Sequence, residues 1–215
     1  MIIKNILFLS IVLIAPVYSA AKIIVIHPAG SIHNPGRSIA ATFERGLTLQ
    51  CAQLLQEALE KQPSAQQHNC IVHISNKAGQ SMTNLEYAQY INQLVPDICI
   101  TLNMYADAST IAPIALFYYS NSALSPLQQK QQNLFTPLER THEQFYHQSK
   151  GYAHTLYEKL LTSTICIPIN PIACPYAPLI GIAVPAIGIE IGVHENNWQL
   201  CIDPLADALL YLLRQ

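Results

Sequence analysis

The stretch from residue 23 to residue 44 constrains the fold of this 215-residue chain more than any other. It reads IIVIHPAGSIHNPGRSIAATFE and starts with a β-branched run, Ile23 to Ile26, typical of a strand buried on both faces. The following loop is rich in glycine and proline, which indicates turns, and Glu44 then begins a helical pattern. This order predicts the edge of an α/β site, because ligands in such folds bind beyond the carboxyl ends of the strands.

The rest of the chain alternates strand and helix patterns. Strands are predicted over residues 70–75, 98–102, 114–119 and 186–191, and helices over residues 44–61, 83–95, 149–162 and 203–213. Thr83 and Glu86 have the spacing of a capping box, and Asp203 is predicted to cap the last helix. Residues 165–180 carry four prolines and are predicted to be an edge strand or irregular, and residues 121–148 a surface excursion. We therefore expect one three-layer α/β/α domain over residues 22–215, with a mostly parallel sheet of about five to six strands.

Composition supports a packed domain and argues against one class of partner. Hydrophobic residues make up 51% of the chain and charged residues 11%, which does not fit a disordered protein. The formal net charge is -2, and the sequence has no cluster of Lys and Arg. Nucleic acid is therefore not an expected partner.

The first twenty residues resemble a targeting segment. Lys4 gives a positive start, an apolar run follows from Ile6 to Ala15, and the segment ends in small residues near Ser19 to Ala21. A membrane anchor is the alternative, but the run is short for a span. We predict a signal peptide over residues 1–20, a secreted or periplasmic location in the cell envelope, and no membrane attachment after cleavage.

All six cysteines follow this segment, at positions 51, 70, 99, 166, 174 and 201. Export would permit disulfides, and six cysteines allow fifteen complete pairings. Cys166 and Cys174 flank a proline-rich stretch and are the favoured pair. Cys51 and Cys99 lie on apolar faces and are predicted to be buried thiols.

Polar residues follow three of the predicted strands, so we expect them to meet in one crevice. They are His27, His33 and Glu44 after the first strand, Asn103 and Asp107 after the third, and Glu190 within the fifth. Glu190 interrupts the apolar run AIGIEIG, where an unpaired carboxylate would be costly to bury. It is either part of a site or a buried salt-bridged or hydrogen-bonded carboxylate.

Five segments in this order resemble the zinc-dependent N-acetylmuramoyl-L-alanine amidases, which cleave the amide between muramic acid and the peptide stem of peptidoglycan. IVIHPAGSIHNPG is similar to the family's V-I-D-P-G-H-G-G-x-D-P-G, and FERGLTLQCAQLLQEAL to its E-K-x-x-x-L helix. EYAQYINQLVPDICITLNMYAD is similar to the segment that includes I-S-I-H-A-N-A, IALFYYS to the next strand, and VPAIGIEIGVHEN to P-A-V-L-V-E-I-G-F-L-S-N. The resemblance covers nearly all of the chain after residue 20 and implies the amidase fold.

The resemblance also implies a site, but this chain departs from it. The family holds zinc with His, Glu and His and uses a second Glu as general base. The metal-binding Glu matches Glu44 and the catalytic Glu matches Glu190, whereas the two zinc histidines match Gly30 and Asn103, and Asn103 is then a binding residue. His27, His33 and His194 are possible substitute ligands.

Three functional hypotheses follow. The first is a divergent amidase-like envelope protein with a degraded zinc site, which binds peptidoglycan, a muropeptide or an envelope partner and has no cofactor. The second is an active zinc amidase in which Glu44 and relocated histidines hold the metal. The third is a structural envelope protein held by disulfides. The oligomeric state stays open.

Overall fold

The computed structural model describes residues 21–62, 70–76, 80–120 and 138–214. Its core is one sheet of six strands in the order β4-β1-β5-β8-β6-β7. The bounds in that order are Ile71–Ile74, Ile23–Pro28, Ile98–Ala106, Ala186–Val193, Ala112–Tyr119 and Cys166–Cys174. Neighbouring strands are parallel except for β8 and β6. The structure thus confirms the predicted α/β fold with a mostly parallel sheet.

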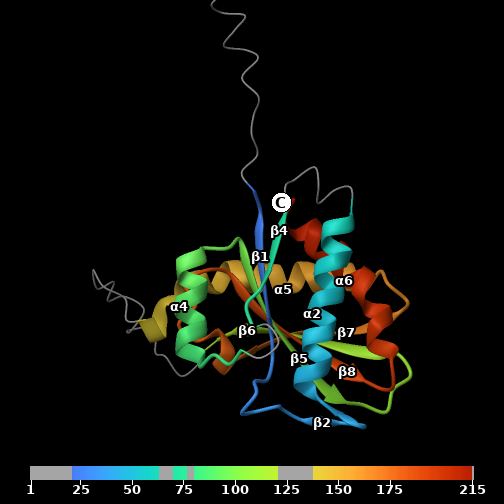
Figure 1. Cartoon of the computed structure of the whole chain (residues 1–215). Coiled ribbons are helices and arrows are strands. Elements are labelled where there is room, and N and C mark those ends of the chain that lie inside the picture. The colour runs from blue at the N-terminus through green and yellow to red at the C-terminus, as the bar shows by residue number, and fades with distance from the viewer. Residues whose placement is uncertain (1–20, 63–69, 77–79, 121–137, 215) are drawn as a thin grey trace, which may run out of the picture.

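Helices cover both faces of this sheet (Figure 1). One face packs against α2, α5 and α6, which span Glu44–Lys61, Tyr146–Leu160 and Ile202–Leu212. The other face packs against α4, Asn84–Leu94, and the short 3-10 helix η3, Ala177–Leu179. Two further 3-10 helices, η2 and η4, span Leu138–Phe145 and Asn197–Cys201.

The apolar runs of the sequence are explained by this double cover. In β1, Ile24 and Ile26 pack in the core beneath α2, whereas Val25 packs in the core beneath α4. Successive side chains of a strand point to opposite faces. Because both faces of the sheet are covered, all three side chains are fully buried. A strand covered on both faces therefore cannot alternate apolar with polar residues.

Most element predictions are close to the structure, and the differences have local causes. Helix α2 has the predicted bounds, and Thr83 and Glu86 form the predicted capping box of α4. Asp203 is not the cap of α6, as predicted, because that helix continues from η4 and Asp203 lies in its first turn. Strand β5 extends to Ala106, four residues beyond its predicted end.

The favoured cysteine pairing is wrong. Cys166 and Cys174 begin and end the same strand, β7. At about 3.3 Å per residue, eight steps separate their Cα atoms by roughly 26 Å, and a disulfide needs about 7 Å or less.

Two predictions lie partly or wholly outside the described residues. The signal segment, residues 1–20, is wholly outside them, as is the first part of the predicted excursion, residues 121–137. The remainder of that excursion is η2 and the start of α5. Within the ranges that are described, no helix has the length and apolar character needed to cross a membrane.

The two edge strands of the sheet differ. β4 has four residues, and β7 has nine, among them Pro168 and Pro171. Proline lacks the N–H that a strand donates, so its presence in β7 agrees with an edge position.

Candidate functional site

A small hairpin sets the geometry at the carboxyl end of the sheet. Strands β2, Ser38–Ile39, and β3, Thr42–Phe43, pair antiparallel with Ser38 opposite Phe43. The residues just outside that pair are Arg37 and Glu44, and the Glu44 N–H donates to the Arg37 carbonyl over 2.8 Å. The side chain of Ile39, 2% exposed, anchors the hairpin in the core. Arg37 and Glu44 are therefore held face to face, with Glu44 at the start of α2 (bottom of Figure 1).

The Glu44 carboxylate is buried and accepts hydrogen bonds at both oxygens. Oε1 accepts from the backbone N–H of Met104 in β5 at 3.0 Å, and Oε2 accepts from the backbone N–H of Arg37 at 3.1 Å. The guanidinium of Arg37 adds a fork, Nε to Oε2 at 3.2 Å and Nη2 to Oε1 at 3.3 Å. The first turn of a helix also favours a negative charge. Glu44 thus has donors at both carboxylate oxygens although its side chain is only 7% exposed.

The same guanidinium reaches the second carboxylate of the predicted site. Nη2 of Arg37 lies 2.5 Å from Oε1 of Glu190, which comes from the middle of β8. Burial by itself lowers the pKa of Arg37, but hydrogen bonds and charges from Glu190 and Glu44 outweigh that effect, and the pKa lies above its ordinary value. We call Arg37, Glu44 and Glu190 the ion cluster.

Asn103 lies beside the ion cluster but is engaged elsewhere. It is directly opposite Glu190 in the parallel pairing of β5 and β8. Its Nδ2 donates to the hydroxyl of Tyr176, whose ring lies over Gly188 and stacks on Phe117 with centroids 5.2 Å apart. A Cβ at position 188 would be 2.7 Å from that ring, so glycine is needed for this approach.

His27 belongs to a second polar cluster, formed with Ser75 and Tyr87. Its Nδ1 is 2.8 Å from the Ser75 hydroxyl, and its ring stacks on Tyr87 with centroids 3.8 Å apart. Burial lowers the pKa of His27 to about 4, so the imidazole is neutral at pH 7. Its contacts are those of a packed, uncharged histidine, because the ring is stacked and one nitrogen is paired.

The other two candidate histidines lie apart from Glu44. His33 is exposed in the loop after β1. His194 follows β8, where its backbone N–H donates to Asn197 and its imidazole interacts with the charge of Asp107. Among the residues described, no three His, Cys, Asp or Glu side chains are arranged to hold a metal ion.

The zinc ion implied by the resemblance does not fit the residues present. Gly30 has a φ of 87°, and a Cβ there would be 2.7 Å from the Cβ of Arg45, so position 30 has no room for an imidazole. Asn103 is a neutral amide bonded to Tyr176. Glu44 is the remaining ligand position, and a cationic guanidinium already contacts both of its oxygens. One carboxylate is too few, because catalytic zinc uses three protein ligands.

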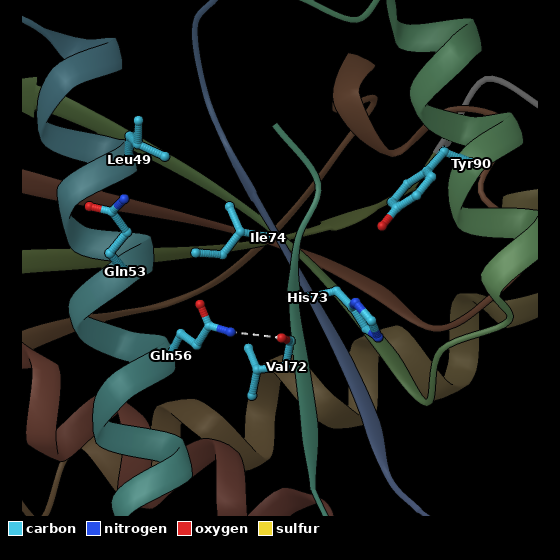
Figure 2. Close-up of a pocket in the computed structure, with 7 residues that line it drawn as sticks. All are labelled: Leu49, Gln53, Gln56, Val72, His73, Ile74 and Tyr90. Carbon is cyan, nitrogen blue, oxygen red and sulfur yellow. Dashed lines mark hydrogen bonds between the residues drawn. The ribbon is translucent and has the colours of Figure 1, made fainter. Parts of the chain in front are cut away.

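A cavity of about 560 Å³ lies away from the ion cluster, at the β4 edge of the sheet (Figure 2). Figure 2 shows Leu49, Gln53 and Gln56 of α2 on one side of β4 and Tyr90 of α4 on the other. Nε2 of Gln56 donates to the Val72 carbonyl on the open edge of the strand, over 2.9 Å. None of Arg37, Glu44 and Glu190 lines this cavity. We therefore assign it no part in the chemistry of the ion cluster.

Two residues of the crevice, Arg37 and Tyr176, were not predicted from the sequence. Each reaches a partner far along the chain, Arg37 to Glu190 and Tyr176 to Asn103. A signal for Arg37 existed, since two carboxylates predicted for one buried crevice require a nearby positive charge.

No protein-family model and no curated protein sequence matches the chain. Solved structures do match its fold. The catalytic domain of CwlV, an N-acetylmuramoyl-L-alanine amidase from Bacillus (Paenibacillus) polymyxa var. colistinus, has a TM-score of 0.63 at 13% identity, over 90% of this chain and 98% of that one. An N-acetylmuramoyl-L-alanine amidase from Clostridium difficile 630 has a TM-score of 0.62 at 17% identity, over 91% and 96%.

A third structure, the CwlD amidase from Clostridioides difficile in complex with the GerS lipoprotein, has a TM-score of 0.55 at 16% identity, over 90% and 96%. Because the match extends over whole catalytic domains, the chain has the fold of the N-acetylmuramoyl-L-alanine amidase catalytic domains.

Proposed function

We propose that this chain is a divergent amidase-like protein of the cell envelope that binds peptidoglycan without hydrolysing it. The observation that carries the proposal is the ion cluster, in which Arg37 lies between the two carboxylates that match the family's metal ligand and general base. The amidase fold and the predicted signal segment support the ligand and the location.

A guanidinium can replace the positive charge of a metal ion but not its chemistry. It stays protonated and only donates hydrogen bonds, so it neither coordinates a water molecule as a metal does nor makes that water acidic. Zinc supplies both effects in amide hydrolysis. Arg37 also donates to Oε1 of Glu190, so a guanidinium occupies the place where a general base would meet its water.

The crevice keeps features that suit a glycan-peptide ligand. The Arg37 side chain is 48% exposed, so part of its donor surface faces solvent, and peptide stems carry carboxylates. Tyr176 and Asn103 supply an aromatic face and an amide beside it. Aromatic rings with a few placed polar groups are typical of small-ligand sites.

The test combines three measurements on the purified chain: zinc content, pull-down on purified sacculi, and release of stem peptides from labelled sacculi with and without added zinc. We expect less than about 0.1 zinc per chain, binding to sacculi, and no release. One retained zinc per chain that is lost in Glu44→Ala, together with release of stem peptides, would establish the active amidase instead.

Variants locate the binding. Arg37→Gln removes the charge at the crevice and should weaken binding to sacculi at least fivefold. Arg45→Gln, a change of an adjacent arginine outside the ion cluster, is the matched control and should bind as the unchanged chain does. Equal binding by all three proteins would move the ligand site away from the ion cluster, and no binding by any of them would reject peptidoglycan as the ligand.

A second candidate ligand is an envelope protein. It is favoured by one observation, that the CwlD amidase, which shares this fold, was solved in complex with a lipoprotein. Failure to bind sacculi, combined with specific capture of one envelope protein that Arg37→Gln abolishes, would favour this candidate.

A further inference from the structure

Two of the six cysteines contact each other across the structure. Cys166 is the first residue of β7, and Cys201 ends η4, immediately before α6. The Cys201 thiol is within hydrogen-bonding reach of the Cys166 sulfur, and both side chains are buried, at 0% and 4% exposure. Both belong to the core beneath α2, α5 and α6.

The remaining cysteines lack such a partner or compete for one of these. Cys99 is paired with the hydroxyl of Tyr87 on the opposite face of the sheet. Cys70 and Cys174 are half-buried near the ends of their strands, and no contact between them and another cysteine is seen in the described part of the chain. Cys51 of α2 lies close enough to Cys201 to influence its charge, so it is the one competitor.

We propose that Cys166 and Cys201 form a disulfide when the chain meets a disulfide oxidant. In the first step the Cys166 thiolate attacks one sulfur of the oxidant, which leaves as a thiolate and gives a mixed disulfide on Cys166. The Cys201 thiol then loses its proton and attacks the Cys166 sulfur, and the second thiol of the oxidant leaves. The two cysteines lose two electrons and two protons, and the oxidant is reduced to two thiols.

The electrostatics of the pair assign these roles. The hydrogen bond from Cys201 lowers the pKa of Cys166 to about 7, with a smaller contribution from Ser163, although burial opposes it. The same hydrogen bond and burial raise the pKa of Cys201 far above its ordinary value. Cys166 is therefore the more easily ionised thiol and the nucleophile of the first step, and Cys201 is the resolving thiol.

The bond would join the outermost strand of the sheet to the start of the last helix. It closes a loop of 36 residues, positions 166 to 201, which includes β8 and therefore Glu190. A cross-link of that length restricts the unfolded chain and should raise the melting temperature.

The experiment incubates the full purified chain with oxidised and reduced glutathione at pH 8. Free thiols are then alkylated in denaturant, and the digested chain is mapped by mass spectrometry. We expect the peptides that hold Cys166 and Cys201 to be joined and the other four cysteines to be alkylated. Alkylation of both cysteines, or a link from Cys51 to Cys201, would overturn the proposal.

Thermal melting gives a second readout. Reduction with dithiothreitol should lower the melting temperature of the oxidised chain by roughly 10 °C. Cys174→Ala, the matched control at the other end of β7, should keep this difference, and Cys166→Ala should lose it. If Cys166→Ala does not fold, the mass-spectrometric map of the unchanged chain still decides. A difference that persists in a folded Cys166→Ala variant would contradict the assignment.

Discussion

The ion cluster and the cluster of His27, Ser75 and Tyr87 lie at the same end of the sheet and meet burial in opposite ways. In the ion cluster two carboxylates meet an internal positive charge, the guanidinium of Arg37. In the second cluster the imidazole gives up its charge, because burial lowers the pKa of His27 to about 4. One cluster thus places a counter-charge beside its buried groups, whereas the other has none, and burial there favours the neutral imidazole.

The largest expected effect comes from removing the counter-charge. Arg37→Ala leaves Glu44 buried with backbone partners only, and a buried charge that loses its partner costs several kcal/mol. Because the Arg37 side chain is 48% exposed, we expect a loss of about 3 kcal/mol in the free energy of unfolding, measured with urea at pH 7. Arg45→Ala is the control, and equal stabilities of the two variants would show that the ion cluster contributes nothing.

The second cluster should make the free energy of unfolding depend on pH, through His27. The pKa of His27 is about 4 in the folded chain and about 6.5 when unfolded, so the unfolded state binds more protons at low pH. The free energy of unfolding is therefore highest above pH 6.5 and falls by about 3 kcal/mol as the pH drops to 4. His27→Gln should flatten this part of the profile and His33→Gln, at an exposed position, should not. Two identical profiles would disprove the burial effect.

The smallest effect is expected at the more exposed carboxylate. Glu190→Gln keeps the shape and one acceptor oxygen, and the Glu190 side chain is 22% exposed, so Arg37 still has Glu44 as its main partner. We expect a loss of about 1 kcal/mol that shrinks as salt is added. Glu195→Gln, a solvent-exposed change two residues after β8, serves for comparison. A loss as large as that of Arg37→Ala would mean that Glu190 and not Glu44 dominates the ion cluster.

Local patterns predicted much of the fold. The helical pattern of α2 and the capping box of Thr83 and Glu86 depend on residues within one or two turns, so the sequence alone locates them. The apolar runs of β1 and β8 likewise indicate strands covered on both faces. The cap at Asp203 could not be predicted, because η4 extends the helix backwards and removes the free start that a cap requires.

The site was only partly predictable. Glu44, Asn103 and Glu190 were expected in one crevice, and the structure places Asn103 opposite Glu190 and joins Glu190 to Glu44 through Arg37. Arg37 itself was not predicted, because the two-residue strands that aim it are too short to give a sequence pattern. The pairing across 153 positions arises only when the sheet assembles.

The two edges of the sheet have a consequence for self-association. An open edge strand is a template on which another chain can add by backbone pairing, and half of this sequence is hydrophobic. At one edge Pro168 and Pro171 remove donors from β7, and at the other β4 is four residues long, with the Val72 carbonyl already satisfied by Gln56. Neither edge offers a long uninterrupted ladder, so the fold itself disfavours strand-by-strand polymerisation into fibrils.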